Sequence, residues 1–236
     1  MESPLYAAFI LGLILGIKHA LDADHLIAVS TIVSDTKNIK WASLIGAFWG
    51  LGHTTTLLVS GLLVIGLRIT IPPRVALSLE FAVAVMLVFL GARLLWRSFR
   101  EDGLHLHAHA HSPQTHAHFH EHEKPQEDHS HAHPFSSMHR PFIVGMVHGL
   151  AGSAALMLLV LAAIPSPLAG LAYILIFGIG SVGGMLALSS LIALPFILTA
   201  RRFALLNQWI RLAAGVASVA FGSFLGWEIG FQQGLF

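Results

Sequence analysis

Six stretches of this chain are long and apolar enough to cross a bilayer, and they predict an all-α integral membrane protein. A spanning helix needs about 20 mostly apolar residues, because its backbone groups must hydrogen-bond internally across the hydrocarbon core. Only 11% of the residues are charged and the mean hydropathy is +0.74, whereas soluble domains are about 25% charged. The six transmembrane helices are predicted at residues 5–33, 39–67, 75–97, 141–164, 168–199 and 204–230.

Lysine and arginine predict the orientation of these spans, because cytoplasmic loops carry an excess of both. Arg68 and Arg74 fall on one side of the membrane. We therefore expect a multi-pass protein of the plasma membrane with both termini outside and residues 101–139 in the cytoplasm. The cytoplasmic side collects Lys37, Lys40, Arg93, Arg97, Arg100, Lys124, Arg140, Arg201 and Arg202.

The rest of the composition excludes several classes of function. A net charge of +1 gives no basic field for nucleic acid. The absence of cysteine excludes thiolate metal sites, iron–sulfur clusters and thiol redox chemistry.

The two halves of the chain resemble each other. The stretch GIKHAL at 16–21 is matched by GMVHGL at 145–150, and FWGLGH at 48–53 by IFGIGS at 176–181. Because each half has an odd number of spans, we expect two inverted three-helix repeats, an arrangement typical of transporters with a site near the midplane. The predicted domains are a first repeat at 1–100 with an HxxDADH metal motif, a His-rich loop at 101–139, and a second repeat at 140–236.

A polar cluster interrupts the first apolar stretch. His19, Asp22, Asp24 and His25 lie within seven residues, although a charge at bilayer depth costs about 2.5–3.5 kcal/mol or more. Imidazole and carboxylate together form a ligand set for a divalent transition metal. On a regular helix His19 and Asp22 share a face while Asp24 and His25 point elsewhere than His19. The four therefore converge only if residues 20–24 are unwound or a second helix contributes. The alternative is a set of carboxylate–histidine pairs that join helices.

Two more histidines lie in apolar stretches. His53, in WGLGHTTT at 49–56, is a candidate fifth ligand or a hydrogen-bonded core residue. His148 is the repeat partner of His19, but the second half has AGSA at 151–154 where the first has the acids. We expect the second half to supply a close-packing surface rather than an equivalent site, and the role of His148 stays open between ligand and structure.

Histidine alternates with small residues in the long loop, where few large apolar side chains are available to form a core. His-rich tracts bind metals, so we predict a disordered cytoplasmic segment with loose affinity for Ni²⁺, Co²⁺, Zn²⁺ or Cu²⁺. The alternative is a solvated linker. The candidate loop ligands are His105, His107, His109, His111, His116, His118, His120 and His122.

The run from His19 to His25 resembles the H-x4-D-H signature of the nickel/cobalt transporter (NiCoT/NicO) family, which here falls on His19, Asp24 and His25. The stretch LGHT at 51–54 resembles that family's LGHS/T motif, and the chain length and HGLAGS at 148–153 resemble its compact UreH-like branch. The resemblance implies Ni²⁺ or Co²⁺ transport, with those three residues essential and His53 supporting. It also implies a cytoplasmic metallochaperone, or a urease or hydrogenase maturation protein, as a partner beside the cation and membrane lipid.

We therefore predict a transporter and not an enzyme, with Ni²⁺ or Co²⁺ as substrate and no catalytic cofactor. Uptake is favoured over efflux of Ni²⁺, Co²⁺ or Zn²⁺, in which the loop would collect metal for export. The rivals from other classes are an intramembrane metal enzyme and a metal sensor or storage protein. Because imidazole must be unprotonated to bind metal, we expect affinity to fall as the pH drops toward about 6.

Overall fold

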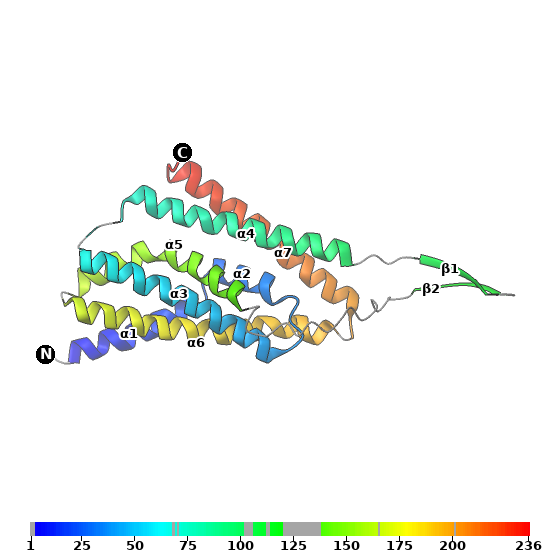
Figure 1. Cartoon of the computed structure of the whole chain (residues 1–236), viewed down its shortest axis with the longest axis horizontal. Coiled ribbons are helices and arrows are strands. Elements are labelled where there is room, and N and C mark those ends of the chain that lie inside the picture. Colours follow the sequence, from blue (N-terminus) through cyan, green and yellow to red (C-terminus); the bar gives the residue numbers. More distant parts are fainter. Residues whose placement is uncertain are drawn as a thin grey trace.

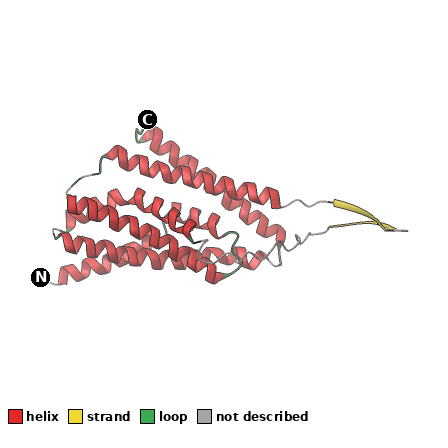
Figure 2. Ribbon diagram, viewed as in Figure 1, coloured by secondary structure: helices red, strands yellow, loops and turns green. Residues whose placement is uncertain are grey.

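The chain forms an elongated helical bundle in the computed structural model, with a β-ribbon in the long loop (Figures 1 and 2). The structure describes residues 3–67, 69, 71–101, 106–111, 114–119, 138–164, 166–200 and 202–236. Its elements are α1 (Ser3–His19), α2 (Ala23–Val33), α3 (Ile39–Leu67), α4 (Pro73–Glu101), β1 (Leu106–His111), β2 (Gln114–Phe119), α5 (His139–Ala163), α6 (Pro167–Ala200), α7 (Ala204–Trp227) and a π-helical turn (Glu228–Gln232).

Within the described residues, four helices have the length and apolarity needed to cross a membrane. They are α3, α4, α6 and α7 with its π-helical turn. The pair α1 and α2 becomes a fifth candidate when it is taken as one span bent by 53°. The remaining predicted span, 141–164, coincides with the 25-residue helix α5. Both termini lie at the end of the bundle opposite to the end of α4 (Figure 1).

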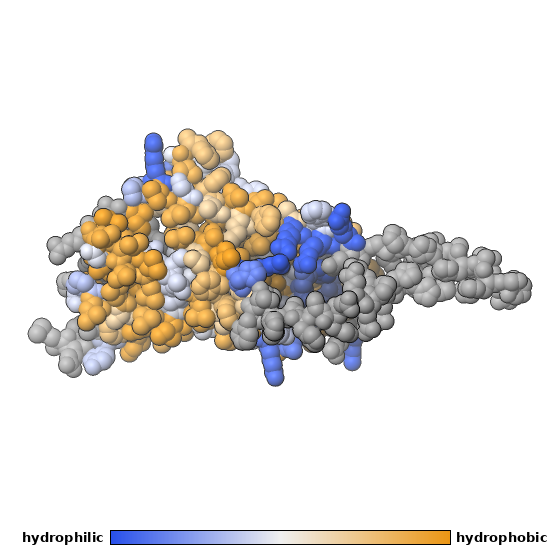
Figure 3. Space-filling model, in the orientation of Figure 1, coloured by the Kyte–Doolittle hydropathy of each residue, from blue (hydrophilic) through white to orange (hydrophobic). Residues whose placement is uncertain are grey.

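On the face seen in Figure 3, the surface of the bundle is apolar over most of its length, and most of the hydrophilic residues gather toward the end that leads to the loop. Large apolar side chains such as Phe99, Leu168 and Trp209 are about 70% exposed or more. Soluble monomers rarely expose apolar surface on this scale, so the helices are suited to contact with lipid acyl chains.

Helix α3 lies at the centre of the bundle, packed against α5 and α6, while α1 packs along α6 and α4 packs along α7. Glycines allow two of these helix pairs, α1 with α6 and α3 with α5, to pack closely. A Cβ on Gly16 would collide with the backbone carbonyl of Phe177, and a Cβ on Gly145 with that of Trp49. Helix backbones can come this close only where one residue has no side chain.

The loop differs from its prediction of no regular structure. Strands β1 and β2 pair antiparallel, from Leu106 opposite Phe119 to His111 opposite Gln114. Alternation of histidine with small residues has the two-residue period of a strand, which accounts for the ribbon. Of the candidate loop ligands, His105, His120 and His122 lie outside the described residues, and the backbone of the other five lies in the ribbon.

Candidate metal centre

The centre is built on a break between α1 and α2. Helix α1 ends at His19 and α2 begins at Ala23. The intervening turn is tight, because the amide of Asp22 donates to the carbonyl of His19 at 3.1 Å, three residues back. Asp22 itself is extended, with φ −63° and ψ 149°. The unwinding that would let the polar residues converge is therefore present, although no glycine or proline lies in the turn.

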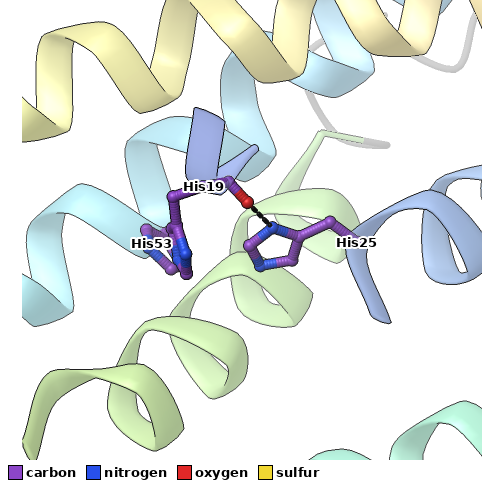
Figure 4. Close-up of side chains that lie close together, drawn as sticks. All are labelled: His19, His25 and His53. Carbon is purple, nitrogen blue, oxygen red and sulfur yellow. Dashed lines mark hydrogen bonds between the residues drawn. The ribbon is translucent and has the colours of Figure 1, made fainter. Parts of the chain in front are cut away.

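His25 is oriented by the broken helix. Its Nδ1 lies 2.9 Å from the carbonyl oxygen of His19 (Figure 4). Because a carbonyl can only accept, Nδ1 carries the proton of a neutral ring and Nε2 keeps a free lone pair. The side chain is 1% exposed. His25 thus presents one metal-binding nitrogen inside the bundle.

His19 is oriented in the same way by a carboxylate. Its Nδ1 lies 2.7 Å from Oδ2 of Asp22. A carboxylate on one ring nitrogen fixes the tautomer and makes the other nitrogen a better metal ligand. Asp22, which is exposed, therefore faces the ring of His19 rather than the centre of the cluster.

His53 comes from the middle of α3 and completes a group of three. Its ring centroid is 5.0 Å from that of His19 and 5.5 Å from that of His25. The side chain is fully buried, and neither ring nitrogen has a hydrogen-bond partner among the described residues. One nitrogen from each of the three rings lies within 4.8 Å of the others, so small side-chain movements would let all three bind one cation.

A second group shares His25 with the first. It joins Asp24, His25 and His148, again with ligand atoms within 4.8 Å of one another. Nε2 of His148 lies 3.8 Å from Oδ2 of Asp24, and its Nδ1 lies 3.3 Å from the carbonyl of Val144. The structure brings His148 beside the first-half residues, at a ring distance of 5.0 Å from His25. In the sequence, the Gly-x-x-His pattern at 16–19 recurs at 145–148, and this repeat is the feature that could have indicated His148 as part of the cluster.

Aromatic rings close one side of the cluster. The indole of Trp49 lies 5.5 Å from the ring of His25, and the ring of Phe177 lies 5.5 Å from that of His19. On another side a cavity of about 320 Å³ separates the cluster from α4 and α7. Its lining comprises His19, Ala23, Asp24, His25, Glu80, Val83, His148, Ala151, Phe221 and Leu225.

The structure thus brings four of the five predicted residues into the two groups and adds His148 to the second. Four imidazoles and one carboxylate converge, while Asp22 acts on His19. Imidazole nitrogen suits late first-row divalent metals, and nearby carboxylates partly neutralise their charge. The arrangement can therefore hold a dehydrated divalent cation inside the bundle.

Comparison with known proteins agrees with this chemistry. The profile of a family described as "NicO: High-affinity nickel-transport protein" matches residues 5–227. The chain is 38% identical to "Urease accessory protein UreH" of Bacillus sp. (strain TB-90) over 237 residues, which is 98% of this chain and 96% of the relative. No solved structure matches the chain.

Proposed function

The chain belongs to the NicO family of high-affinity nickel-transport proteins, and we propose that it carries Ni²⁺, and also Co²⁺, through the plasma membrane by way of the histidine cluster. The family is one of transporters rather than catalysts. The proposed binding residues are His19, Asp24, His25 and His53, with Asp22 orienting His19.

The observation that supports this site best is the unsatisfied imidazole of His53. A buried polar group without a partner costs free energy, yet both nitrogens of this fully buried ring are unpaired within the described part of the chain. The two neighbouring rings of His19 and His25 each have Nδ1 already engaged, and each has a nitrogen within 4.8 Å of a nitrogen of His53. A divalent cation satisfies all three rings at once, whereas a merely structural network would pair them with each other or with backbone.

Paired contacts support six spans in two inverted repeats. The contact of Gly16 with Phe177 corresponds to that of Gly145 with Trp49, because the two glycines are 129 residues apart and their two partners 128. The same offsets relate two further contacts, Gly180 with Leu13 and Gly52 with Phe142. The cluster lies between the two halves, so rocking of one half against the other would expose it to alternate sides of the membrane.

We propose uptake as the direction of transport. The relative's name links it to urease, and imported nickel would supply a cytoplasmic metallochaperone or a urease or hydrogenase maturation protein. In this scheme the loop histidines lie in the cytoplasm and receive the metal as it leaves the transmembrane site.

The test is flux of radioactive nickel into proteoliposomes. His53→Phe replaces the buried imidazole with a somewhat larger aromatic ring that has no nitrogen, and we expect it to abolish most of the saturable flux. His139→Ala removes an exposed histidine at the start of α5 and should leave flux near the wild-type rate. Equal flux in the wild type and in His53→Phe would overturn the proposed site.

Direction is tested in cells under nickel limitation. Uptake predicts that deletion of the gene lowers urease or hydrogenase activity and that added nickel restores it. Increased nickel sensitivity of the deletion strain, with enzyme activity intact, would instead establish efflux.

A further inference from the structure

The cluster contains two overlapping sets of ligands rather than one. His19 and His53 form the first set with His25, and Asp24 and His148 form the second with the same residue. We propose that the cation occupies these two positions in succession and that His25 passes it from one to the other. The inference rests on the proposed function, because it divides the transport site into two steps.

His25 limits the cluster to one ion at a time. Its Nδ1 donates to the carbonyl of His19, which leaves Nε2 as its single metal-binding atom. One nitrogen lone pair binds one cation, so the two positions exclude each other. Transfer is then an exchange of ligands, in which His25 stays bound while bonds to one pair of partners break and bonds to the other pair form.

The two positions differ in charge and in access. The first is made of three imidazoles. His19 and His25 line the 320 Å³ cavity, but the third member, His53, is fully buried and does not. The second includes the carboxylate of Asp24, and all three of its members line that cavity. A partly hydrated cation from the cavity would therefore meet the carboxylate position first, and would lose more of its water on moving to the three imidazoles.

Glu80 extends the path into the cavity. This half-buried residue of α4 lines the cavity together with Asp24 and His148, and it has no ion pair within the part of the chain that the structure describes. A carboxylate at this place would attract a hydrated divalent cation toward the second position. Its substitution should affect capture of the cation rather than the bound complex.

The experiment uses Co²⁺ as a spectroscopic probe, since its visible absorption depends on ligand type and geometry. The loop histidines are replaced by alanine in the full-length chain, so that only the transmembrane cluster binds. In this background the wild type should bind one Co²⁺. His53→Phe should hold it at the carboxylate position and Asp24→Asn at the imidazole position, giving two distinct spectra.

Measurements of transport in two further variants distinguish the two positions. His148→Gln keeps a side chain of similar size, and we expect it to retain one bound Co²⁺ with the spectrum of Asp24→Asn, while its flux falls at least tenfold. Glu80→Gln should raise the concentration needed for half-maximal flux several-fold and leave the spectrum of bound Co²⁺ unchanged.

The outcomes distinguish this inference from the proposed function. If His53→Phe loses Co²⁺ binding while His148→Gln transports like the wild type, the cluster is one three-histidine site and the two-position inference is wrong. Identical spectra in His53→Phe and Asp24→Asn would also overturn it. If His53→Phe and His25→Ala both leave binding and flux intact, the proposed function itself fails.

Discussion

Two neighbouring glycines of α6 allow a matched test of how packing positions the metal centre. Gly184 faces the break between α1 and α2, and a Cβ built on it would lie 2.7 Å from Cβ of Ala20 and 3.1 Å from the carbonyl oxygen of Ile17. Gly183 faces outward, and a Cβ there would meet no described atom within 4 Å. Both substitutions to alanine gain helix propensity equally, so their difference isolates the contact with the break.

The size of the effect follows from these distances. Carbon atoms pack at about 3.5–4.0 Å, so Gly184→Ala requires Ala20 to move by roughly 1 Å. Overpacking of this kind costs about 1–3 kcal/mol, and the adjacent ring of His19 would move with the break. Since metal sites tolerate about 0.2 Å in ligand distance, we expect Gly184→Ala to weaken nickel binding about tenfold or more.

The assay compares the melting temperature of each variant in detergent and its nickel affinity by competition with a chromophoric chelator. Gly183→Ala should match or exceed the wild type in stability and bind nickel equally well. Gly184→Ala should melt lower, by about 2–4 °C for each kcal/mol in a chain of this size. Equal melting temperature and equal affinity in the two variants would refute the packing argument.

Asp22, Ser218 and Asp35 give further tests. Asp22→Asn removes the charge beside Nδ1 of His19, and nickel affinity measured by chelator competition should fall 10–100-fold; unchanged affinity would contradict the orienting role. The buried hydroxyl of Ser218 donates to the carbonyl of Leu87 at 2.7 Å, so Ser218→Ala should lower the unfolding free energy by about 1 kcal/mol, whereas the exposed control Ser78→Ala should not. Asp35→Asn removes ion pairs with arginines of α4 and α7. Because these pairs are partly exposed, the melting temperature of the variant should fall only slightly at low salt and should equal that of the wild type in 1 M salt.

Apolar length predicted the helical fold. The predicted span at 5–33 is divided into α1 and α2, whereas the other five predicted spans agree closely with single helices. The matched motifs at 16–21 and 145–150 lie where α1 packs on α6 and α5 packs on α3. Those motifs contain the glycines at which helix backbones meet. Apolar stretches and small residues predict helices and their close contacts from the sequence, because each feature depends on residues of a single helix face.

The polar cluster suggested an unwound segment at residues 20–24, where the structure has a break at 20–22, but the local sequence could not establish it. The turn has no glycine or proline, and the contacts that accompany it come from distant parts of the chain or from side chains of the cluster itself. Gly184 packs on Ala20, His25 donates to the freed carbonyl of His19, and Asp22 pairs with the ring of His19. The contact from Gly184 of α6 is tertiary, and tertiary packing can override the local preference for a continuous helix.

The role of His148 was obscured by the loss of the acidic residues around it. The second half keeps the histidine of its Gly-x-x-His motif but not the aspartates, so the sequence left the role of His148 open between ligand and structure. In the structure, Asp24 of the first half lies beside His148. The first half therefore supplies the carboxylate for the histidines of both halves. The ribbon of the loop was missed for a different reason, because its alternating pattern lacks the large residues that usually mark a strand.

The central claim is that imidazoles inside the bundle bind the transported cation after it has lost most of its water. X-ray absorption at the nickel edge tests this directly, on full-length protein in which the loop histidines are alanine and one Ni²⁺ is bound. We predict the scattering pattern of several imidazole rings around nickel, and we expect this pattern to be lost in His25→Ala. A nickel ion surrounded only by oxygen ligands, or one whose spectrum is the same in His25→Ala, would contradict the account.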